Sequence, residues 1–363
     1  MSLLVAILVS ALIVLGSPFM GQLQRFLRQS LSTRNYVLLF GVGVLAAVGL
    51  LILLAFVRIR ERRGQRFAML VIALVFGGAY MWWTGTPYPE VNAVERVHFV
   101  EYGLIAFLFY RAWKSAGDPS IVILPLLAGF AVGTFDEWLQ WFIPYRVGEA
   151  HDVFINLAAI ICGLLFALAL LPPAAFSFRL SARSWRRIGI ASAIVWLVFA
   201  TFVSQVHLGH MISVPDIGRF KSHYTDDELH DLQGQRASLW QTQPPINIPR
   251  LSREDQYLDE GLAHVRKRNS TEQIGEAWRE NLILERFFVP VLDMPTYASP
   301  NGNRWPPEQR ADISQRAGAM DAFLSTAESY PIYVWSGRVF WSVVILVALI
   351  FAVAPLGFAR RDQ

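Results

Sequence analysis

Residues 133–163 read GTFDEWLQWFIPYRVGEAHDVFINLAAIICG, and apolar segments flank this run on both sides. The pattern predicts the end of a hairpin between two membrane-spanning helices. A carboxylate near the middle of a bilayer costs about 2.5–3.5 kcal/mol on insertion scales, so it is kept where a partner, water or a ligand offsets that cost. The hairpin is therefore the first place to look for function. Its polar side chains are those of Asp136, Glu137, Gln140, Arg146, Asp152 and Asn156.

The composition of the whole chain is that of a polytopic membrane protein. The chain has 363 residues, of which 54% are hydrophobic and 17% are charged, and its mean hydropathy is +0.38. Its net charge of +4 is too small to indicate a nucleic-acid partner. The single cysteine, Cys162, lies in an apolar stretch and can form no intrachain disulfide, so we expect a small core residue.

Eight stretches are long and apolar enough to predict spanning helices, since about 20 mostly apolar residues cross the hydrocarbon layer. The first lacks the basic start and the cleavage site of a signal peptide, so we expect a retained helix. Charged residues crowd the start of the fourth. The predicted fold is all-α, a polytopic transmembrane bundle of about eight spans with an extracytoplasmic helical domain inserted before the last span. The spans are residues 3–19, 36–57, 67–83, 94–113, 121–142, 153–171, 188–206 and 334–356.

Basic residues gather in four segments that fall on one side of the membrane if eight spans alternate. The positive-inside rule makes that side cytoplasmic. We therefore expect a multi-pass protein of the cell inner (plasma) membrane, with both termini cytoplasmic and residues 207–332 extracytoplasmic. Residues 22–34 carry arginines on the other side, and their apolar spacing predicts an interfacial amphipathic helix. The four segments hold Arg58 to Arg66, Arg111 with Lys114, Arg179 to Arg187, and Arg360 with Arg361.

The predicted domain organisation has five parts: two spans in residues 1–66, a four-span core in 67–171, a seventh span in 172–206, the outer domain in 207–332, and the last span with a short cytoplasmic tail in 333–363. Within the outer domain, helices are predicted over 226–240, 254–269, 271–288 and 306–329. The expected N-caps are Thr225, Ser252, and Ser270 or Thr271, and Pro306–Pro307 opens the last helix. His207, His210 and Asp216 are expected to be solvated.

Polar residues from spans four, five and six converge within about two helical turns of the predicted outer surface. Asn156 continues into Ala159 and Gly163, a small-residue face suited to close helix contact. The candidate ligand-binding residues are Glu95, Arg96, His98, Glu101, Tyr102, Glu137, Gln140, Arg146, Asp152 and Asn156.

Several kinds of chemistry are open to these residues. Glu137 can act as a general base, a metal ligand or an acceptor for a polar head group, or it can form a structural ion pair with Arg146 or Arg96. His98 can simply bond a neighbour, and Asp152 can pin the start of its helix. The chain has neither an HExxH nor a GxSxG motif. We therefore expect no metal and no cofactor, and the sequence favours a non-enzyme without excluding an enzyme.

Three segments together resemble the VanZ-like family of integral membrane proteins: ERVHFVEYG at residues 95–103, EWLQWFIPYR at 137–146 and DVFINLAAIICG at 152–163. The resemblance covers about residues 67–171 and implies an envelope membrane protein that acts at the outer leaflet. It does not imply antibiotic resistance. The matching residues are Glu95, Arg96, His98, Phe99, Glu137, Gln140, Phe142, Pro144, Arg146, Asp152, Asn156 and Gly163.

Three functions follow as the main hypotheses, and a transporter comes fourth because no inverted repeat or broken helix pair is evident in the sequence. The first is a non-enzymatic protein that binds a polar lipid, a lipid-linked glycan or another amphiphile at the outer leaflet. Its expected partners are membrane lipids and, through residues 207–332, a membrane or periplasmic protein. The second is an intramembrane enzyme acting on a lipid-linked or cell-wall substrate, with Glu137 or Asp152 as base and His98 as its partner. The third is a structural subunit of a larger membrane complex.

Overall fold

The computed structural model describes the chain except for residues 1–2, 144–145, 147, 247–254, 319–322 and 362–363, and it describes no side chains beyond residue 355. The chain forms two compact units. Unit 1 comprises Met1–Gln140, Gly148–Phe202 and Trp341–Gln363, and unit 2 comprises Trp141–Val147 and Val203–Phe340. The predicted all-α class is confirmed, since 74% of the structure is helical.

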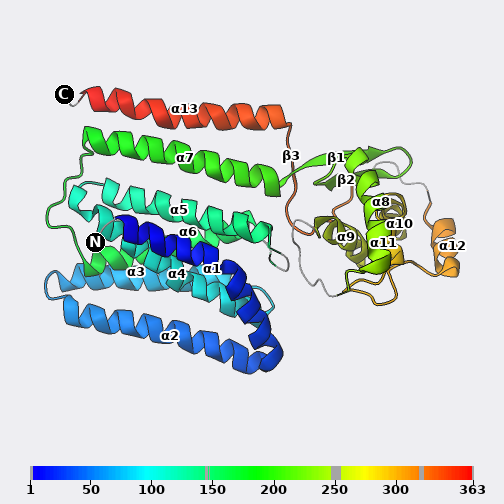
Figure 1. Cartoon of the computed structure of the whole chain (residues 1–363), viewed down its shortest axis with the longest axis horizontal. Coiled ribbons are helices and arrows are strands. Elements are labelled where there is room, and N and C mark those ends of the chain that lie inside the picture. The colour runs from blue at the N-terminus through cyan, green and yellow to red at the C-terminus, as the bar shows by residue number, and fades with distance from the viewer. Residues whose placement is uncertain (1–2, 144–145, 147, 247–254, 319–322, 362–363) are drawn as a thin grey trace. The chain divides into compact units, whose positions relative to one another are not determined.

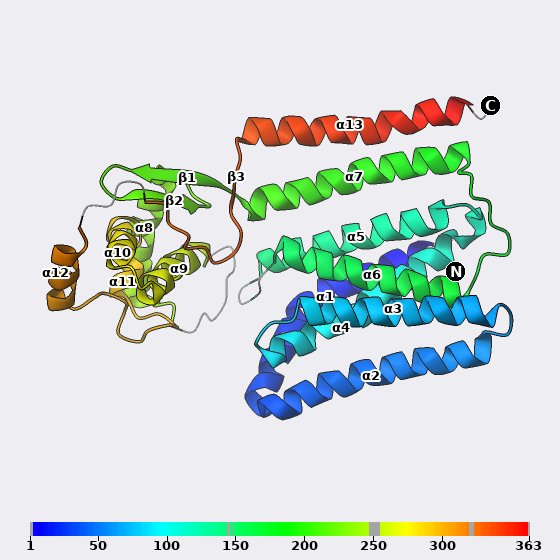
Figure 2. The same cartoon turned by 180° about the vertical axis from the view of Figure 1, so that it is seen from behind.

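Unit 1 is built from long helices that run side by side (Figures 1 and 2). Within the described residues, seven helices are long and apolar enough to cross a membrane: α1, α2, α3, α5, α6, α7 and α13. The predicted fourth span, α4, does not reach that standard because it carries five charged residues, Glu90, Glu95, Arg96, Glu101 and Arg111. The helices are α1 (Leu3–Ser30), α2 (Thr33–Arg58), α3 (Arg63–Trp83), α4 (Pro89–Trp113), α5 (Ser120–Trp141), α6 (Ala150–Leu170), α7 (Ala182–Val206) and α13 (Gly337–Arg361).

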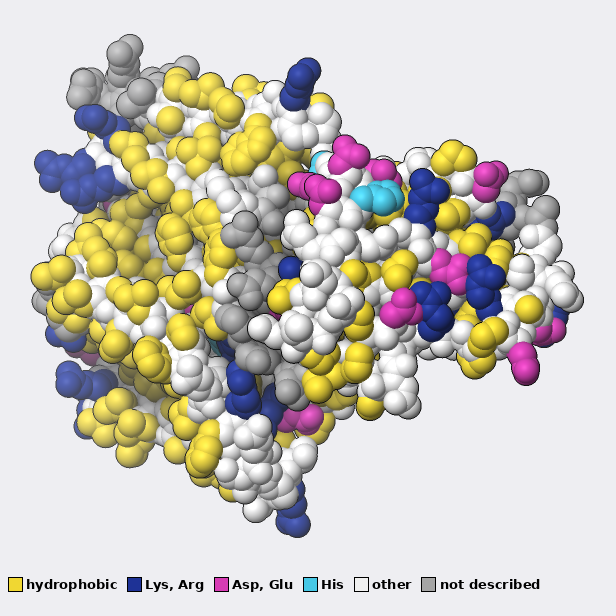
Figure 3. Space-filling model, turned by 45° about the vertical axis from the view of Figure 1, so that its right-hand side comes forward, with side chains coloured by type: hydrophobic (Ala, Val, Ile, Leu, Met, Phe, Trp, Pro, Cys, Tyr) yellow, Lys and Arg dark blue, Asp and Glu magenta, His cyan; other side chains and the backbone are white. Residues whose placement is uncertain are grey.

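The surface of unit 1 is suited to lipid rather than to water. Leu12, Phe19 and Leu45 are 72%, 71% and 72% exposed, and hydrophobic side chains dominate the face of this unit that Figure 3 shows. Exposed apolar surface of this extent marks a contact with membrane or protein. The helix α4 differs, because Tyr102, Ile105 and other residues along it are fully buried.

The first helix departs from the expected boundaries. The sequence predicted a span that ends at residue 19 and a separate interfacial helix, whereas α1 continues to Ser30. Pro18 lies inside it and lacks the N–H that would bond the preceding turn. A proline at such a position bends a helix, and Figure 1 shows the later part of α1 running in a new direction.

The helices α4 and α6 meet at two glycines. A Cβ atom placed on Gly163 would lie 2.5 Å from the Gly103 Cα and 2.6 Å from the Gly103 carbonyl oxygen. A side chain at this point would push the two backbones apart. The predicted small-residue face of α6 is confirmed, and Ala159 continues it into the core around Tyr102.

Three of the basic connections meet at one end of unit 1. The Arg66 side chain donates from Nε to the Ala169 carbonyl at 2.6 Å and from Nη2 to the Leu170 carbonyl at 3.0 Å. These bonds satisfy carbonyls that the end of α6 leaves open. The Tyr110 hydroxyl donates to the Leu171 carbonyl at 2.6 Å. The start of α3 and the ends of α4 and α6 therefore lie together. The side of the membrane on which they lie stays a prediction.

Unit 2 combines helices with a small sheet that the sequence did not predict. Its strands are β1 (Leu208–Val214), β2 (Gly218–Ser222) and β3 (Tyr333–Val334), in the order β2-β1-β3. The β1–β2 hairpin is antiparallel, and β3 runs parallel to β1. The helices are α8 (Asp226–Thr242), α9 (Gln256–Ser270), α10 (Ile274–Phe287), α11 (Val289–Asp293) and α12 (Pro307–Arg316).

Some of the predicted helix starts in unit 2 are confirmed and one is wrong. Thr225 caps α8 in a capping box with Glu228, as expected. Pro306–Pro307 opens α12, also as expected. The predicted caps at Ser270 or Thr271 are wrong, because α10 begins after Gln273. The predicted cap Ser252 lies outside the described residues.

Two further expectations about unit 2 are wrong. The last predicted helix ends at Arg316 rather than at residue 329, because Gly318 adopts a φ of 61°, the left-handed conformation that terminates helices. His207 is 2% exposed rather than solvated. Its Nδ1 lies 2.9 Å from the Pro331 carbonyl, while His210 and Asp216 are exposed.

Candidate functional site

A polar cluster lies inside unit 1 where α4, α5 and α6 meet. Its members are buried or half-buried, and each helix of the three supplies at least one of them. The helices α4 and α6 approach closely at Gly103 and Gly163. Side chains within two turns before these glycines can therefore reach α5. The polar cluster consists of His98, Tyr102, Asp136, Glu137, Gln140 and Asn156.

Hydrogen bonds connect three members of the polar cluster around one carboxyl oxygen. The Tyr102 hydroxyl donates to Asp136 Oδ2 at 2.9 Å, and Gln140 Nε2 donates to the same oxygen at 3.1 Å. Gln140 Nε2 also lies 3.4 Å from Glu137 Oε1. Asp136 and Gln140 are four residues apart on α5, so they share one face of that helix. Two adjacent carboxyl groups are thus held in place by an amide and a phenol.

Two close contacts shape the polar cluster. The His98 ring stacks on the Tyr102 ring with centroids 5.9 Å apart and planes inclined by 10°. Gly133 of α5 lies against α6, since a Cβ there would be 3.1 Å from the Asn156 Cβ and 3.5 Å from Tyr102 Cε1. A larger residue at Gly133 would therefore press on both Asn156 and Tyr102.

Asn156 is the most unusual member of the polar cluster. Its side chain is 1% exposed, and neither its amide oxygen nor its amide nitrogen has a hydrogen-bond partner among the residues that the structure describes. A buried polar group left in this state costs about 1–3 kcal/mol. Such a group calls for an explanation, and an amide that can both donate and accept is suited to bind a polar ligand.

Four other sequence candidates lie on α4 and α6. Arg96 is exposed, and Glu95, Glu101 and Asp152 are half-buried. Glu95 interacts electrostatically with His151 near the start of α6. Asp152 lies in the first turn of α6, where a negative charge favours the helix dipole.

Arg146 belongs to unit 2 and is half-buried there. The contacts described above bring together five of the ten candidates, His98, Tyr102, Glu137, Gln140 and Asn156.

The candidate set omitted two residues that the structure makes central. Asp136 accepts both hydrogen bonds described above. Asp136 belongs to the polar run at residues 133–163, and its spacing of four residues from Gln140 is the signal that could have selected it. Gly133 carries no polar group. Its position one turn before Glu137, on the same face of α5, is the one sequence signal for its contact with another helix.

Unit 2 holds two buried carboxylates of another kind. Glu260 accepts from the Ser222 hydroxyl at 2.6 Å and lies 2.8 Å from His223 Nδ1. Glu280 accepts from the Ser325 hydroxyl at 2.6 Å and lies 2.6 Å from His264 Nδ1. In both places the carboxylate stands between the serine and the histidine. A catalytic triad instead places the histidine in the middle, so neither cluster has the arrangement of a serine triad.

The long apolar helices of unit 1 and its buried polar cluster define a helical membrane protein with a polar site among its helices. Residues 3–172 match the family model described as VanZ/LLP1, and this match supports a VanZ-like protein. The match begins at α1, so it extends further toward the N-terminus than the predicted residues 67–171. Comparisons with curated proteins and with solved structures gave no match.

Proposed function

We propose that this VanZ-like membrane protein is a non-enzymatic binder of an amphiphile, either a polar lipid or a lipid-linked glycan, and that the polar cluster receives its head group. The buried amide of Asn156, which has no hydrogen-bond partner among the described residues, carries the proposal. An amide in this state gains the full value of any hydrogen bond that a ligand supplies, because no bond to the protein has to be given up.

The chemistry of the polar cluster indicates what kind of head group it suits. Asn156 offers two N–H donors and a carbonyl acceptor, and Asp136 and Glu137 offer carboxyl oxygens. Hydroxyl groups of a sugar or a glycerol can donate to the carboxyl groups and accept from the amide at the same time. In a buried site each of these bonds is stronger than in water, so a hydroxylated head group would be well distinguished from a plain hydrocarbon.

The position of the polar cluster along the helices is consistent with the head-group region of a leaflet. Asp136 is five residues from the end of α5 and Asn156 is six residues from the start of α6, or about 8–9 Å at 1.5 Å per residue. The positive-inside rule would place the basic connections in the cytoplasm and this hairpin at the outer leaflet of the inner membrane. Residues 207–332 would then be extracytoplasmic and available to a partner protein.

Lipid analysis of the purified protein tests this proposal. Protein extracted from its own membranes should carry a polar lipid or glycolipid that mass spectrometry detects. Asn156→Leu should lose that lipid. Thr134→Val is the matched control, since Thr134 is equally buried on α5 and its hydroxyl bonds the Phe130 carbonyl of its own helix at 2.9 Å. Equal lipid content in all three proteins would contradict the proposal.

A second candidate function is an intramembrane enzyme, and the stacking of His98 on Tyr102 beside two carboxyl groups favours it. A carboxylate could remove a proton from the substrate while an imidazole returns one. Turnover of a labelled lipid-linked substrate should then vanish in Glu137→Gln and His98→Ala while Thr134→Val keeps it. If both substituted proteins turn over the labelled substrate as fast as the unsubstituted protein, the catalytic alternative fails.

A further inference from the structure

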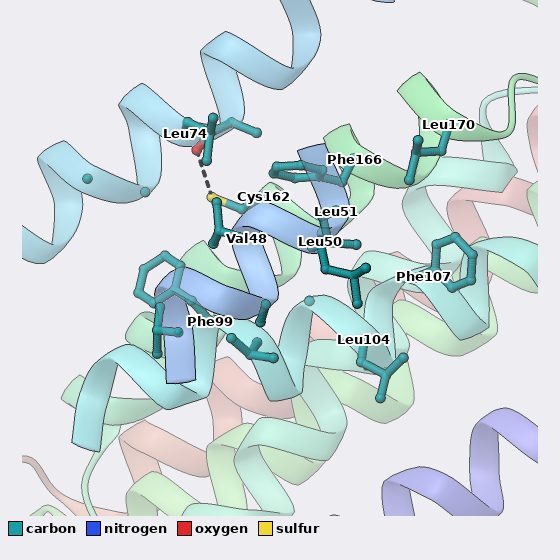
Figure 4. Close-up of a pocket in the computed structure, with 18 of the residues that line it drawn as sticks. Val48, Leu50, Leu51, Leu74, Phe99, Leu104, Phe107, Cys162, Phe166 and Leu170 are labelled. Atoms are coloured by element: carbon teal, nitrogen blue, oxygen red, sulfur yellow. Dashed lines mark hydrogen bonds between the residues drawn. The ribbon is translucent and has the colours of Figure 1, made fainter. Parts of the chain in front are cut away.

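A cavity of about 460 Å³ lies between α2, α3, α4 and α6 of unit 1 (Figure 4). Its wall is apolar throughout, with Phe99, Leu104 and Phe166 among its members. The Cys162 thiol also lines it, and Sγ donates to the Ala73 carbonyl at 3.3 Å, so this group is satisfied within the protein. The volume falls within the range of about 300–1,000 Å³ typical of small-molecule sites.

The cavity exists because α2 is held to the rest of unit 1 near its two ends. The buried residues of α2 are Tyr36, close to its start, and Ala55, close to its end. Ala55 packs with Leu70 and Ala169 in a small apolar cluster. Between these two points, residues 44–54 of α2 supply one wall of the cavity. On the opposite wall, Gly78 has no atom within 4 Å of the place where a side chain would begin.

The length of the cavity and the helices that form it indicate which molecules surround it. The lining runs from Phe99 to Phe107 on α4 and from Cys162 to Leu170 on α6, which is about 12 Å at 1.5 Å per residue. Three of its four walls are helices that meet the criteria for membrane spans. A length of about 12 Å fits within one leaflet of a hydrocarbon layer about 30 Å thick. The molecules that surround membrane-spanning helices within the hydrocarbon layer are lipid tails.

Other occupants fit less well. Water does not fill a cavity with an apolar wall. A single hydrocarbon chain is narrow enough to enter beside α2 and needs no polar partner.

We propose that this cavity holds one acyl chain of a bilayer phospholipid, bound between α2 and the other three helices. The proposal does not rest on the polar cluster, which uses a different face of the α4–α6 pair: Tyr102 contacts α5, whereas Gly103 and Gly163 line the cavity. The bound chain would fill the space under the middle of α2 and hold that helix in place.

Native mass spectrometry of the full chain tests this proposal, after reconstitution in dioleoylphosphatidylcholine vesicles and extraction with mild detergent. The unsubstituted protein should retain one phospholipid. Gly78→Phe, which fills the cavity, should retain about tenfold less, the change that corresponds to about 1.4 kcal/mol of binding free energy. Gly49→Phe is the matched control, because Gly49 is exposed on α2, has open space in front of it and does not line the cavity.

A second substitution tests the proposal if Gly78→Phe does not fold. Ala47→Phe fills the same cavity from α2 and should also abolish retention of the phospholipid. The proposal is overturned if the unsubstituted protein retains no phospholipid. It is equally overturned if folded Gly78→Phe or folded Ala47→Phe retains as much phospholipid as Gly49→Phe.

Discussion

Asn156 in unit 1 and Asn281 in unit 2 carry the same side chain and are each 1% exposed, yet their surroundings differ. The Asn281 oxygen accepts from Arg268 Nη1 at 2.9 Å, and its nitrogen donates to Glu285 Oε1 at 2.9 Å. Asn156 has neither bond among the described residues. The difference indicates that Asn281 helps to hold unit 2 together, whereas Asn156 keeps hydrogen-bonding capacity for something else.

The buried carboxylates of unit 2 extend the comparison. Glu280 is fully buried, and both of its oxygens have partners in Ser325 and His264. Each such group is satisfied within its own unit, as folded domains require. Substitutions that remove one buried polar group at a time test this contrast with Asn156.

The largest effect is expected for Asn281→Leu. This change removes hydrogen bonds to the Arg268 guanidinium and the Glu285 carboxylate, and bonds to charged groups contribute about 1.5–3 kcal/mol each. The free energy of unfolding of unit 2 should fall by about 4 kcal/mol, measured as the loss of hydrogen-exchange protection in α9 and α10 of the full chain. A decrease below about 1 kcal/mol would remove the basis of the comparison.

The second-largest effect is expected for a substitution at Asp118 in unit 1. This residue shows that other buried polar groups of unit 1 have hydrogen-bond partners within the protein. Asp118 is buried and accepts from the Ser120 N–H at 3.0 Å, the Ser184 hydroxyl at 2.7 Å and the Ser181 N–H at 3.2 Å. We expect Asp118→Ala to lower the stability of the full chain in detergent by about 2 kcal/mol. A thermal midpoint equal to that of the unsubstituted protein would contradict this.

The same aspartate predicts a pH dependence. Burial alone would raise the pKa of the Asp118 carboxyl, but hydrogen bonds from Ser120, Ser184 and Ser181 outweigh it, so the pKa lies below its usual value. The stabilising contribution is therefore present above the unfolded pKa of about 3.9 and is lost as the pH falls through the lower folded value. The stability difference between the unsubstituted protein and Asp118→Ala should shrink over that acidic range, and a constant difference would refute the assignment.

A smaller effect is expected within the polar cluster. Tyr102→Phe keeps the ring that stacks on His98 and removes the hydroxyl that donates to Asp136. The free energy of unfolding should fall by about 1 kcal/mol. Head-group binding should weaken as well, because Asp136 loses one of the bonds that orient it. An unchanged lipid content in Tyr102→Phe would count against a role for Asp136 in binding.

The smallest effect on stability is expected for Asn156→Leu. Replacing a buried amide that has no partner with an apolar side chain of similar size is neutral or stabilising, by up to about 1 kcal/mol. The thermal midpoint in detergent, measured beside Asn281→Leu, should therefore stay the same or rise. A loss of 2 kcal/mol or more would mean that Asn156 is bonded within the protein after all.

Much of the membrane unit could be predicted from the sequence because a spanning helix leaves a long apolar signature. Seven of the eight predicted spans meet the same standard in the structure. The exception, α4, is enclosed by other helices, and a helix shielded from lipid can carry charge. The boundary at Pro18 was harder, since a proline can end a helix or only bend it.

The strands of unit 2 and the contacts within the polar cluster were harder to predict from the sequence. The strand LGHMISV is short and its burial alternates only in part, while the helices around it have clear periodicity. The sequence placed Glu137, Gln140 and Asn156 on facing helices, and the structure brings them together. It could not show that Asp136 rather than Glu137 receives the Tyr102 hydroxyl, because that choice depends on how α4 and α5 are rotated.

The most direct test of the central claim is an experimental density map of the protein purified from its own membranes, resolved around the side chain of Asn156. The proposal predicts density for a bound molecule with a polar atom about 3 Å from the Asn156 amide, at hydrogen-bond distance. An Asn156 amide bonded only to protein side chains, with no bound molecule beside it, would contradict the proposal.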